Sequence, residues 1–194
     1  MNTSNPFDGE RKPGSVGLPL PNVQIRITES GSKAPLPKKE IGMIQIKGPN
    51  VFRSYWNNDR ANKESFTDDG YFITGDLGFI DQDGYLHISG REKDLIISGG
   101  FNIYPKEIED LINNHSDVKE SAVVGLKDDD LGEVPIAVIV VDMKLKSRVL
   151  KDLESLFQQN LAKFKAPKQI KILDKLPRNA MGKIQKNAII KLIA

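Results

Sequence analysis

A lysine near the end of the sequence stands in a setting that suits contact with anions. Lys183 follows Gly182 in the segment Pro-Arg-Asn-Ala-Met-Gly-Lys, residues 177–183. Glycine lets a loop enter a tight cleft, and a flexible ammonium placed between two anions stabilises negative charge that develops in a reaction. The alternative is that Lys183 is one of several exposed lysines in this region, such as Lys186 and Lys191.

A carboxylate and a guanidinium lie on either side of an expected β-hairpin. Asp76 follows Gly75, and a carboxylate in this position can accept hydrogen bonds from two hydroxyl groups, as a ribose offers. Arg91 ends the second strand, and its planar fork suits ribose or phosphate oxygens. Both could instead be structural, with Asp76 capping its own turn and Arg91 forming a surface ion pair with Asp76 or Asp94.

The segment after Arg91 contains a glycine pair with two interpretations. Ser98, Gly99 and Gly100 predict a tight turn between a strand and a helix, or a place where backbone comes close to a slender ligand. Lys93 has no chemical role that its neighbours suggest, and it is consistent with a solvated lysine in a linker.

Composition excludes several classes of protein. The chain has 194 residues, 39% hydrophobic and 28% charged, which is ordinary for a globular protein. Its net charge of +2 is too balanced to indicate a nucleic-acid partner. The absence of cysteine excludes disulfides and fits a reducing compartment. The longest apolar stretch, residues 135–141, is too short to span a membrane. These features predict a cytoplasmic protein without a membrane span.

The spacing of apolar residues predicts a β-rich first half and a mixed second half, so we expect an α+β fold. Prolines and glycines in residues 1–22 favour a loop, and the rest of the first ninety residues predicts a small barrel or sheet. In that part we expect strands at 23–28, 41–47, 72–81 and 85–89 and a short helix at 58–65. In the second half we expect strands at 95–97, 118–126, 134–141 and 169–173, and helices beginning at Pro105 and covering 147–161 and 186–193.

Three motifs occur in one order along the chain and together carry a family resemblance. They are Gly-Tyr-Phe-Ile-Thr-Gly-Asp at 70–76, Gly-Arg-Glu-Lys-Asp-Leu-Ile-Ile-Ser-Gly-Gly at 90–100, and the lysine motif at 177–183. In this order they resemble the C-terminal part of the AMP-forming acyl-CoA synthetases, members of the adenylate-forming superfamily. The likeness runs from Met1 to the end. One departure is Met43, where many relatives carry glutamate, and its place within a strand puts little function in doubt.

The resemblance implies a domain organisation and a role for each motif. Residues 1–91 would be the β-rich end of the large AMP-binding domain, a distorted barrel, and residues 92–194 the complete C-terminal lid. Lys183 would act as the catalytic cation in the attack of a carboxylate on the α-phosphate of ATP, and would also contact the nucleotide. Asp76 and Arg91 would bind the nucleotide.

The second half-reaction implies roles for the segment between the two domains. Lys93 would be the hinge about which the lid turns. The backbone of Ser98, Gly99 and Gly100 would line the tunnel for the pantetheine of CoA. The implied co-substrates are ATP with Mg²⁺, CoA and a small carboxylic acid.

Several elements that relatives need for adenylation are not in this sequence. The phosphate loop, the adenine-binding residues and the Thr-Glu element, whose glutamate holds magnesium, lie upstream in relatives. We therefore expect no metal site here, a requirement for the N-terminal domain as partner, and no adenylation by the chain alone.

The acyl substrate has several interpretations. Residues 1–9 and 177–187 look most like malonyl-CoA synthetases, which activate malonate and methylmalonate, while fatty-acyl- and aryl-CoA ligases are alternatives. Two other classes also compete. One is an adenylation domain that transfers the acyl group to a carrier protein, and the other is a non-catalytic interaction module that uses the sheet of the second half.

Overall fold

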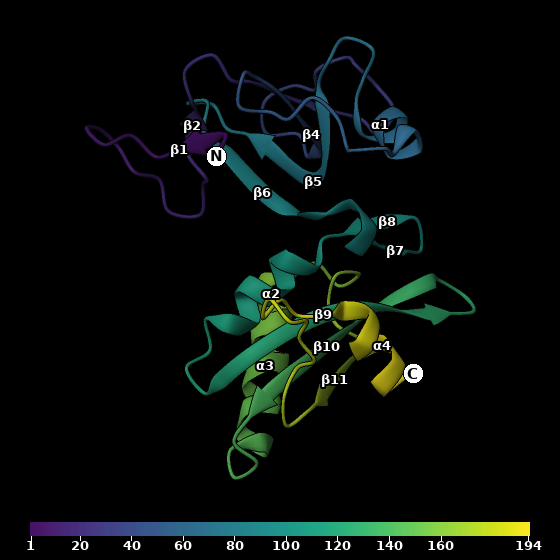
Figure 1. The fold of residues 1–194 in the computed structure, drawn as a ribbon. Helices are drawn as coiled ribbons and strands as arrows, with labels where there is room; N and C mark the ends of the chain where they lie inside the picture. Colours follow the sequence, from purple (N-terminus) through teal and green to yellow (C-terminus); the bar gives the residue numbers. More distant parts are fainter. The chain divides into compact units, whose positions relative to one another are not determined.

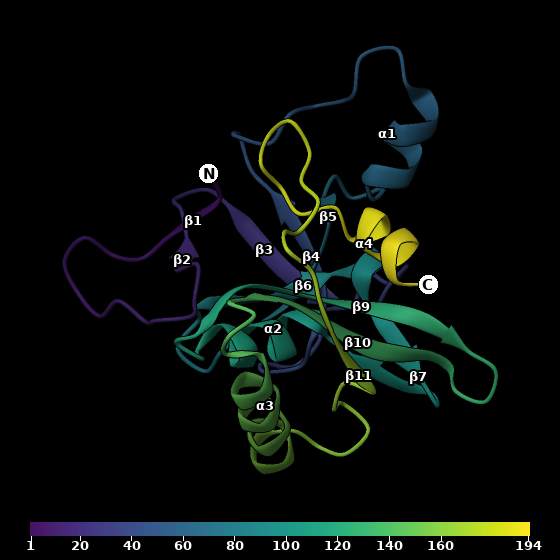
Figure 2. The ribbon, with the colours of Figure 1, turned by 90° about the horizontal axis from the view of Figure 1, so that it is seen from below.

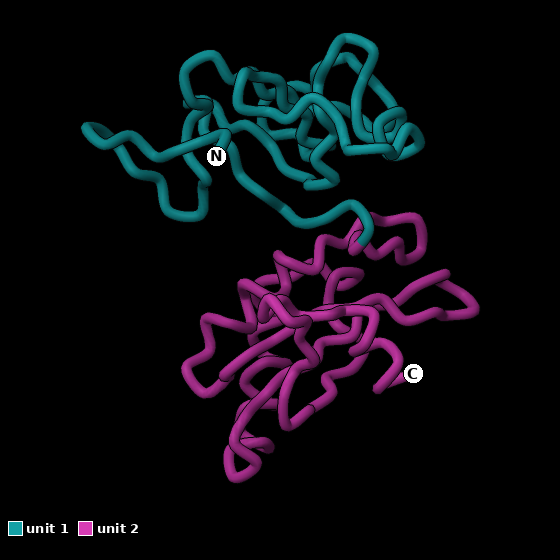
Figure 3. Tube along the Cα trace, viewed as in Figure 1, with its two compact units in different colours: residues 1–93 teal, residues 94–194 magenta.

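The computed structural model describes residues 1–194 and divides the chain into two compact units. Unit 1 is Met1–Lys93 and unit 2 is Asp94–Ala194 (Figure 3). A short 3-10 helix, η1 (Glu92–Asp94), lies at this division, close to the boundary expected after residue 91. Whether the units are the end of a large domain and a lid stays a prediction.

Unit 1 is built on an open antiparallel sheet with the strand order β3-β4-β5-β6, of which Figure 1 labels β4, β5 and β6 and Figure 2 labels β3. Its strands are β3 (Gln24–Thr28), β4 (Gly42–Lys47), β5 (Phe72–Ile80) and β6 (Leu86–Arg91). Strands β3 and β6 are edges that do not pair with each other, so the expected distorted barrel is wrong in that respect. Barrel closure needs more strands, because few strands cannot curve round to meet.

The first residues of unit 1 contain short pairing that the sequence did not predict. Strands β1 (Thr3–Ser4) and β2 (Leu18–Pro19) form a two-stranded antiparallel sheet. Helix α1 (Asp59–Ser65) begins as expected, because the side chain of Asn58 accepts a hydrogen bond from the Ala61 N–H at 3.1 Å.

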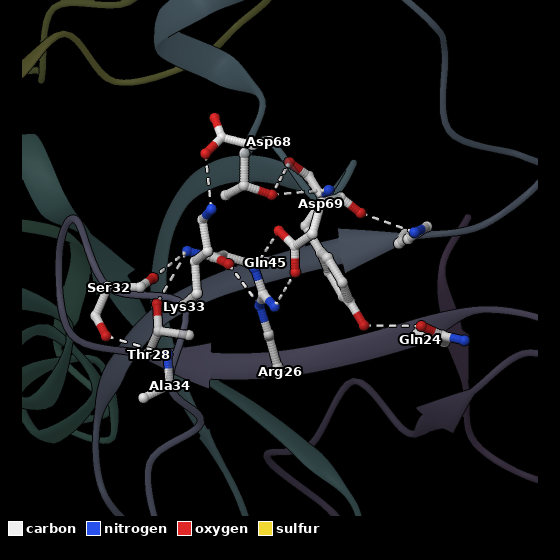
Figure 4. Close-up of polar contacts among 12 residues, drawn as sticks. Gln24, Arg26, Thr28, Ser32, Lys33, Ala34, Gln45, Asp68 and Asp69 are labelled. Atoms are coloured by element: carbon white, nitrogen blue, oxygen red, sulfur yellow. Dashed lines mark hydrogen bonds and ion pairs between the residues drawn. The ribbon is translucent and has the colours of Figure 1, made fainter.

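A polar network ties the turn that precedes β5 to the neighbouring strands (Figure 4). Arg26 on β3 donates two hydrogen bonds to the Asp69 carboxylate, at 2.7 and 3.0 Å, and one to Gln45 Oε1 at 2.7 Å. The guanidinium also lies 3.8 Å from the ring centroid of Tyr71. Gln45 is fully buried, and its amide donates to Thr28 Oγ1 at 3.0 Å. The hydrogen bonds from Arg26 hold the pKa of Asp69 well below its usual range.

Unit 2 is a five-stranded sheet in which β10 is central. Its strands are β7 (Ile96–Ser98), β8 (Phe101–Ile103), β9 (Val118–Asp128), β10 (Gly132–Val141) and β11 (Gln169–Ile172). Strand β10 pairs with β9 and β7 antiparallel and with β11 parallel. Its helices are α2 (Pro105–Asn113), α3 (Lys146–Asn160) and α4 (Lys186–Ile193).

Helices cover both faces of this sheet, with α2 and α3 on one side and α4 on the other (Figure 2). Side chains of β10 alternate between the two cores because successive residues of a strand point to opposite faces. Ala137, Ile139 and Val141 join the core with α2 and α3, and Ile136, Val138 and Val140 join the core with α4.

The α+β class and most expected elements are confirmed. Strand β8 was missed, because three residues are too few to show alternation. The glycine pair therefore joins two strands, and the prediction that it leads from a strand into a helix is wrong. None of the helices has both the length and the apolar character that crossing a membrane would need.

The network around Arg26 yields a stability prediction. Arg26→Lys should lower the free energy of unfolding by about 1–3 kcal/mol, because lysine keeps the charge but lacks the planar fork that makes two bonds to Asp69 and one to Gln45. Urea-induced unfolding followed by far-UV circular dichroism measures the change. Lys33→Ala, which breaks the exposed pair with Asp68, is the control and should stay within about 0.5 kcal/mol of the unsubstituted chain. Equal effects of the two substitutions would contradict the role given to Arg26.

Candidate functional site

The Thr-Gly-Asp motif forms an irregularity in the middle of β5. The pairing of β4 with β5 shifts here, so that Thr74, Gly75 and Asp76 together face Ile44. The Thr74 hydroxyl donates to the Ile44 carbonyl at 2.8 Å and accepts from the Asp76 N–H at 3.0 Å. Gly75 has a φ of 72°, which favours glycine. Thr74 thus fixes the backbone from which the Asp76 side chain projects.

Asp76 and Arg91 are in direct contact on unit 1. They are register partners on β5 and β6, and Arg91 Nε lies 2.9 Å from Asp76 Oδ1. Arg91 also donates from Nη1 to the Thr74 carbonyl at 3.2 Å. The second carboxylate oxygen, Oδ2, accepts no hydrogen bond from the chain. The pair therefore leaves an acceptor and part of a cationic fork for a ligand.

The charged form of Asp76 is disfavoured by its surroundings. Burial raises the pKa of Asp76 above its ordinary value of 3.8, and the positive charge of Arg91 opposes this shift. A carboxyl whose pKa is perturbed by burial and that faces one specific charge is a common feature of binding sites.

The glycine pair of unit 2 forms the two-residue turn of the β7–β8 hairpin. Gly99 and Gly100 have φ values of 55° and 83°, as such turns require. The Gly99 N–H donates to the Leu131 carbonyl at 2.9 Å. A Cβ at Gly100 would meet no atom within 4 Å, so the backbone is open to its surroundings there. Ser98 is buried. Phe101 is 55% exposed and stacks on Phe164.

The segment 177–185, which we call the lysine loop, has a fixed backbone. The Lys183 N–H donates to Asn179 Oδ1, and the Lys183 carbonyl accepts from the Asn179 N–H, both at 2.9 Å. The Asn179 carbonyl accepts from Gly182, whose φ is 77°. Arg178 and Ile184 pair as an isolated β-bridge, and Gln185 donates to the Pro177 carbonyl.

The side chain of Lys183 differs from the two neighbouring cations. Arg178 pairs with Glu120 on β9 at 2.9 Å, and Lys186 pairs with Glu109 on α2 at 2.7 Å. The Lys183 ammonium is exposed and has no hydrogen bond or ion pair within the chain. It is therefore free to meet an external anion.

Apart from Ser98, which is buried, the residues predicted from the sequence lie at the surfaces of their own units. Asp76 and Arg91 are brought together in unit 1, and Lys93 lies at the end of that unit. Ser98–Gly100 and Lys183 belong to unit 2. None of them lines the hollow of about 760 Å³ that lies between β10, β11 and α4. No three or more His, Asp or Glu side chains gather where they could hold a metal ion.

Sequence reasoning did not identify the residues that support these side chains. Asn179 stands inside the lysine motif, but nothing in the sequence shows that its amide oxygen accepts two backbone N–H groups. Glu120 is 58 residues away from Arg178 along the chain. Thr74 could have been identified, because a threonine before a glycine at a strand irregularity commonly bonds nearby backbone.

Two family models match the chain. Residues 107–183 match the AMP-binding enzyme C-terminal domain, and residues 1–56 match the AMP-binding enzyme family. The malonate–CoA ligase of Arabidopsis thaliana is 40% identical over 98% of this chain, and the chain covers 32% of that protein. The chain spans about a third of the length of the curated relatives that it matches.

Solved structures agree with these matches. ATP-bound MatB from Rhodopseudomonas palustris superposes with a TM-score of 0.89 and 51% identity, over 99% of this chain and 38% of that one. The o-succinylbenzoate CoA synthetase of Bacillus subtilis, in complex with ATP and a magnesium ion, gives a TM-score of 0.78 and 40% identity, over 91% of this chain and 35% of that one.

The raised pKa of Asp76 predicts a pH-dependent effect on stability. Because the folded chain binds this proton more tightly than the unfolded chain, stability falls as pH rises through the two pKa values. The cost is complete above the folded pKa and absent below the unfolded one. Asp76→Asn should therefore raise the free energy of unfolding at pH 7, or at least not lower it. The difference from the unsubstituted chain should disappear toward pH 3.

Chemical denaturation at a series of pH values measures this difference. Asp8→Asn, at an exposed and unpaired carboxylate, is the matched control and should show no such trend. A clear loss of stability at pH 7 for Asp76→Asn would contradict the assignment, since it would mean that the ion pair with Arg91 outweighs burial.

Proposed function

Because the chain belongs to the family of AMP-binding enzymes, we propose that it is the C-terminal part of an ATP-dependent carboxylate–CoA ligase. Such an enzyme makes an acyl-adenylate and then an acyl-CoA thioester. The observation that carries the proposal is the Lys183 ammonium, which stands without a counter-ion on a loop whose backbone is fixed. The absence of cysteine fits a reducing compartment, and we propose a cytoplasmic location.

Lys183 would act in the first half-reaction. A carboxylate oxygen of the substrate forms a bond to the α-phosphorus of ATP, and the bond to the bridging oxygen breaks as pyrophosphate leaves. The reaction brings two anions together, and an ammonium between them offsets their repulsion and stabilises the charge that develops. Magnesium, when bound with ATP, neutralises phosphate charge, and its ligand would come from outside this chain.

Asp76 and Arg91 would hold the nucleotide. Asp76 Oδ2 is free to accept from a ribose hydroxyl, while Oδ1 is occupied by Arg91. The Arg91 fork is itself half exposed, so part of it can also meet ribose or phosphate oxygens. Support for this role comes from the raised pKa of Asp76, since a carboxylate that costs stability suggests a functional reason for its place.

The hairpin turn and the unit boundary would serve the second half-reaction. The thiolate of CoA attacks the acyl carbonyl of the adenylate, and AMP leaves. The open backbone at Gly100 favours close approach of a slender chain such as pantetheine, beside Ser98 and Gly99. Lys93 would be the hinge, and its place next to the division between the two units supports that role.

For the acyl group we propose malonate or methylmalonate. The support is similarity to a malonate–CoA ligase. The Bacillus relative, named for o-succinylbenzoate, is 40% identical to this chain, as the malonate–CoA ligase is, so fatty-acyl and aryl substrates remain to be compared with malonate in one assay. Names of relatives favour CoA over a carrier protein as acceptor.

The role of Lys183 is tested in a hybrid enzyme. In it, this chain replaces the matching 38% of Rhodopseudomonas palustris MatB. Lys183→Ala should lower the rate of adenylation, measured as pyrophosphate release, by about 100-fold or more, because one charge-stabilising group is lost. Thioester formation from supplied acyl-adenylate should change far less.

A matched control and a contrary outcome accompany this test. Lys191→Ala removes an exposed lysine that also has no ion pair, and should leave both half-reactions unchanged. Equal losses in the two half-reactions for Lys183→Ala would remove the assigned role.

The chain by itself should not adenylate a carboxylic acid. It holds Asp76, Arg91 and Lys183, while the phosphate loop and the magnesium ligand of relatives are not in this sequence. A coupled assay with ATP, CoA, magnesium and malonate should show no pyrophosphate above the background of a heat-treated sample. Sustained release of pyrophosphate by the chain alone would overturn the prediction.

A further inference from the structure

The lysine loop separates a fixed backbone from a free side chain. Both backbone groups of Lys183 bond to Asn179, and Asn179 Oδ1 also accepts from the Met181 N–H at 3.0 Å. One amide oxygen therefore joins the backbone on the two sides of Gly182. A Cβ at Gly182 would meet no atom within 4 Å, so the turn is held by these hydrogen bonds and not by packing.

Arg178 ties this turn to the sheet. Its Nη1 donates to the Gly182 carbonyl at 2.5 Å, and its Nη2 donates to Glu120 Oε1 at 2.9 Å. Glu120 lies on β9 opposite Val140 of the central strand. A planar guanidinium that bonds both partners at once fixes an angle as well as a distance, which lysine could not do. The side chains of this pair are partly exposed, so their main effect is on geometry and not on stability.

Ion pairs also neutralise two of the three cations in this region. Arg178 is committed to Glu120, and Lys186 to Glu109, which also accepts from the Val123 N–H at 2.8 Å. Without these carboxylates, three cations within nine residues would compete for one anion. With them, the positive charge that remains available is that of Lys183.

A charged group accelerates a reaction most when it does not have to be ordered at the moment of reaction. A free loop would lose backbone conformational entropy on each encounter with the nucleotide. The hydrogen bonds of Asn179 and Arg178 order the loop beforehand.

We propose that Asn179, together with the Arg178–Glu120 pair, positions Lys183 for the adenylation step. We call these three residues the loop latch. They do not touch the substrate, and they act only through the direction in which the Lys183 side chain leaves the backbone. This inference rests on the proposed function of Lys183, and it adds three positioning residues to it.

The structural part is tested on the chain itself by amide hydrogen exchange. Asn179→Ala should speed exchange at the Met181 and Lys183 amides by about 10-fold or more, because both lose their acceptor. Asn179→Asp keeps Oδ1 and should retain protection. Glu120→Ala should also speed exchange at Lys183, whereas Glu120→Gln keeps an acceptor for Arg178 and should not. Unchanged exchange in both alanine variants would overturn the loop latch.

The functional part uses the hybrid enzyme and a double-substitution cycle. Asn179→Ala should lower kcat for adenylation by about 10- to 100-fold, with thioester formation from supplied acyl-adenylate unchanged. In the Lys183→Ala background, Asn179→Ala should cause no further loss, because a positioning residue has nothing left to position. A residue needed only for folding would lower both half-reactions and would add its loss to that of Lys183→Ala.

The outcomes separate this inference from the proposed function. Additive losses, or full adenylation by Asn179→Ala, would overturn the loop latch while leaving Lys183 in place. An unsubstituted hybrid that does not adenylate would contradict the proposed function, and the exchange data would then decide whether the latch fixes the loop.

Discussion

A cation can act on anions outside its own unit only if that unit has not already neutralised it. This constraint organises the C-terminal part of unit 2. Glu120 and Glu109 take the charges of Arg178 and Lys186, and the hydrogen bonds of Asn179 fix the backbone between them. Lys183 is left with an ordered backbone and an uncommitted ammonium. Neither condition would suffice alone, because a free charge on a loose loop is poorly placed and a fixed but paired charge is unavailable.

Unit 1 shows the opposite arrangement, in which a carboxylate is kept charged at a cost. Asp76 is partly removed from water, and Arg91 compensates only in part, so the pKa is raised. The backbone around it is held by the Thr74 hydroxyl and by the network of Arg26 at the start of β5. A rigid strand irregularity and a costly charge are both expected where a protein prepares a binding group before the ligand arrives.

The two units are stabilised by different kinds of contact. Unit 2 is built on a central strand whose side chains fill two apolar cores. The lysine loop is anchored in the core beside α4, because Leu176 before the loop and Ile189 after it are both buried there. Unit 1 has a smaller core on an open sheet, and it relies more on polar contacts such as the bonds of Arg26 to Asp69 and Gln45. Lys183, the proposed catalytic cation, therefore belongs to the unit with the larger apolar core. Asp76 and Arg91, the proposed nucleotide-binding residues, belong to the unit that relies more on polar contacts.

The sequence by itself determined the element types and the residues that could do chemistry. The continuous apolar run of β10, the Asn58 cap of α1 and Pro105 in the first turn of α2 are local signals, and local signals can be read without a fold. The motifs around Asp76, Arg91 and Lys183 were visible for the same reason. Only the tertiary structure decided that the four strands of unit 1 stay open, that the glycine pair closes a hairpin, and that Glu120 reaches Arg178. These three features depend on which segments meet in space, and contacts between distant segments produce no periodic pattern in the sequence.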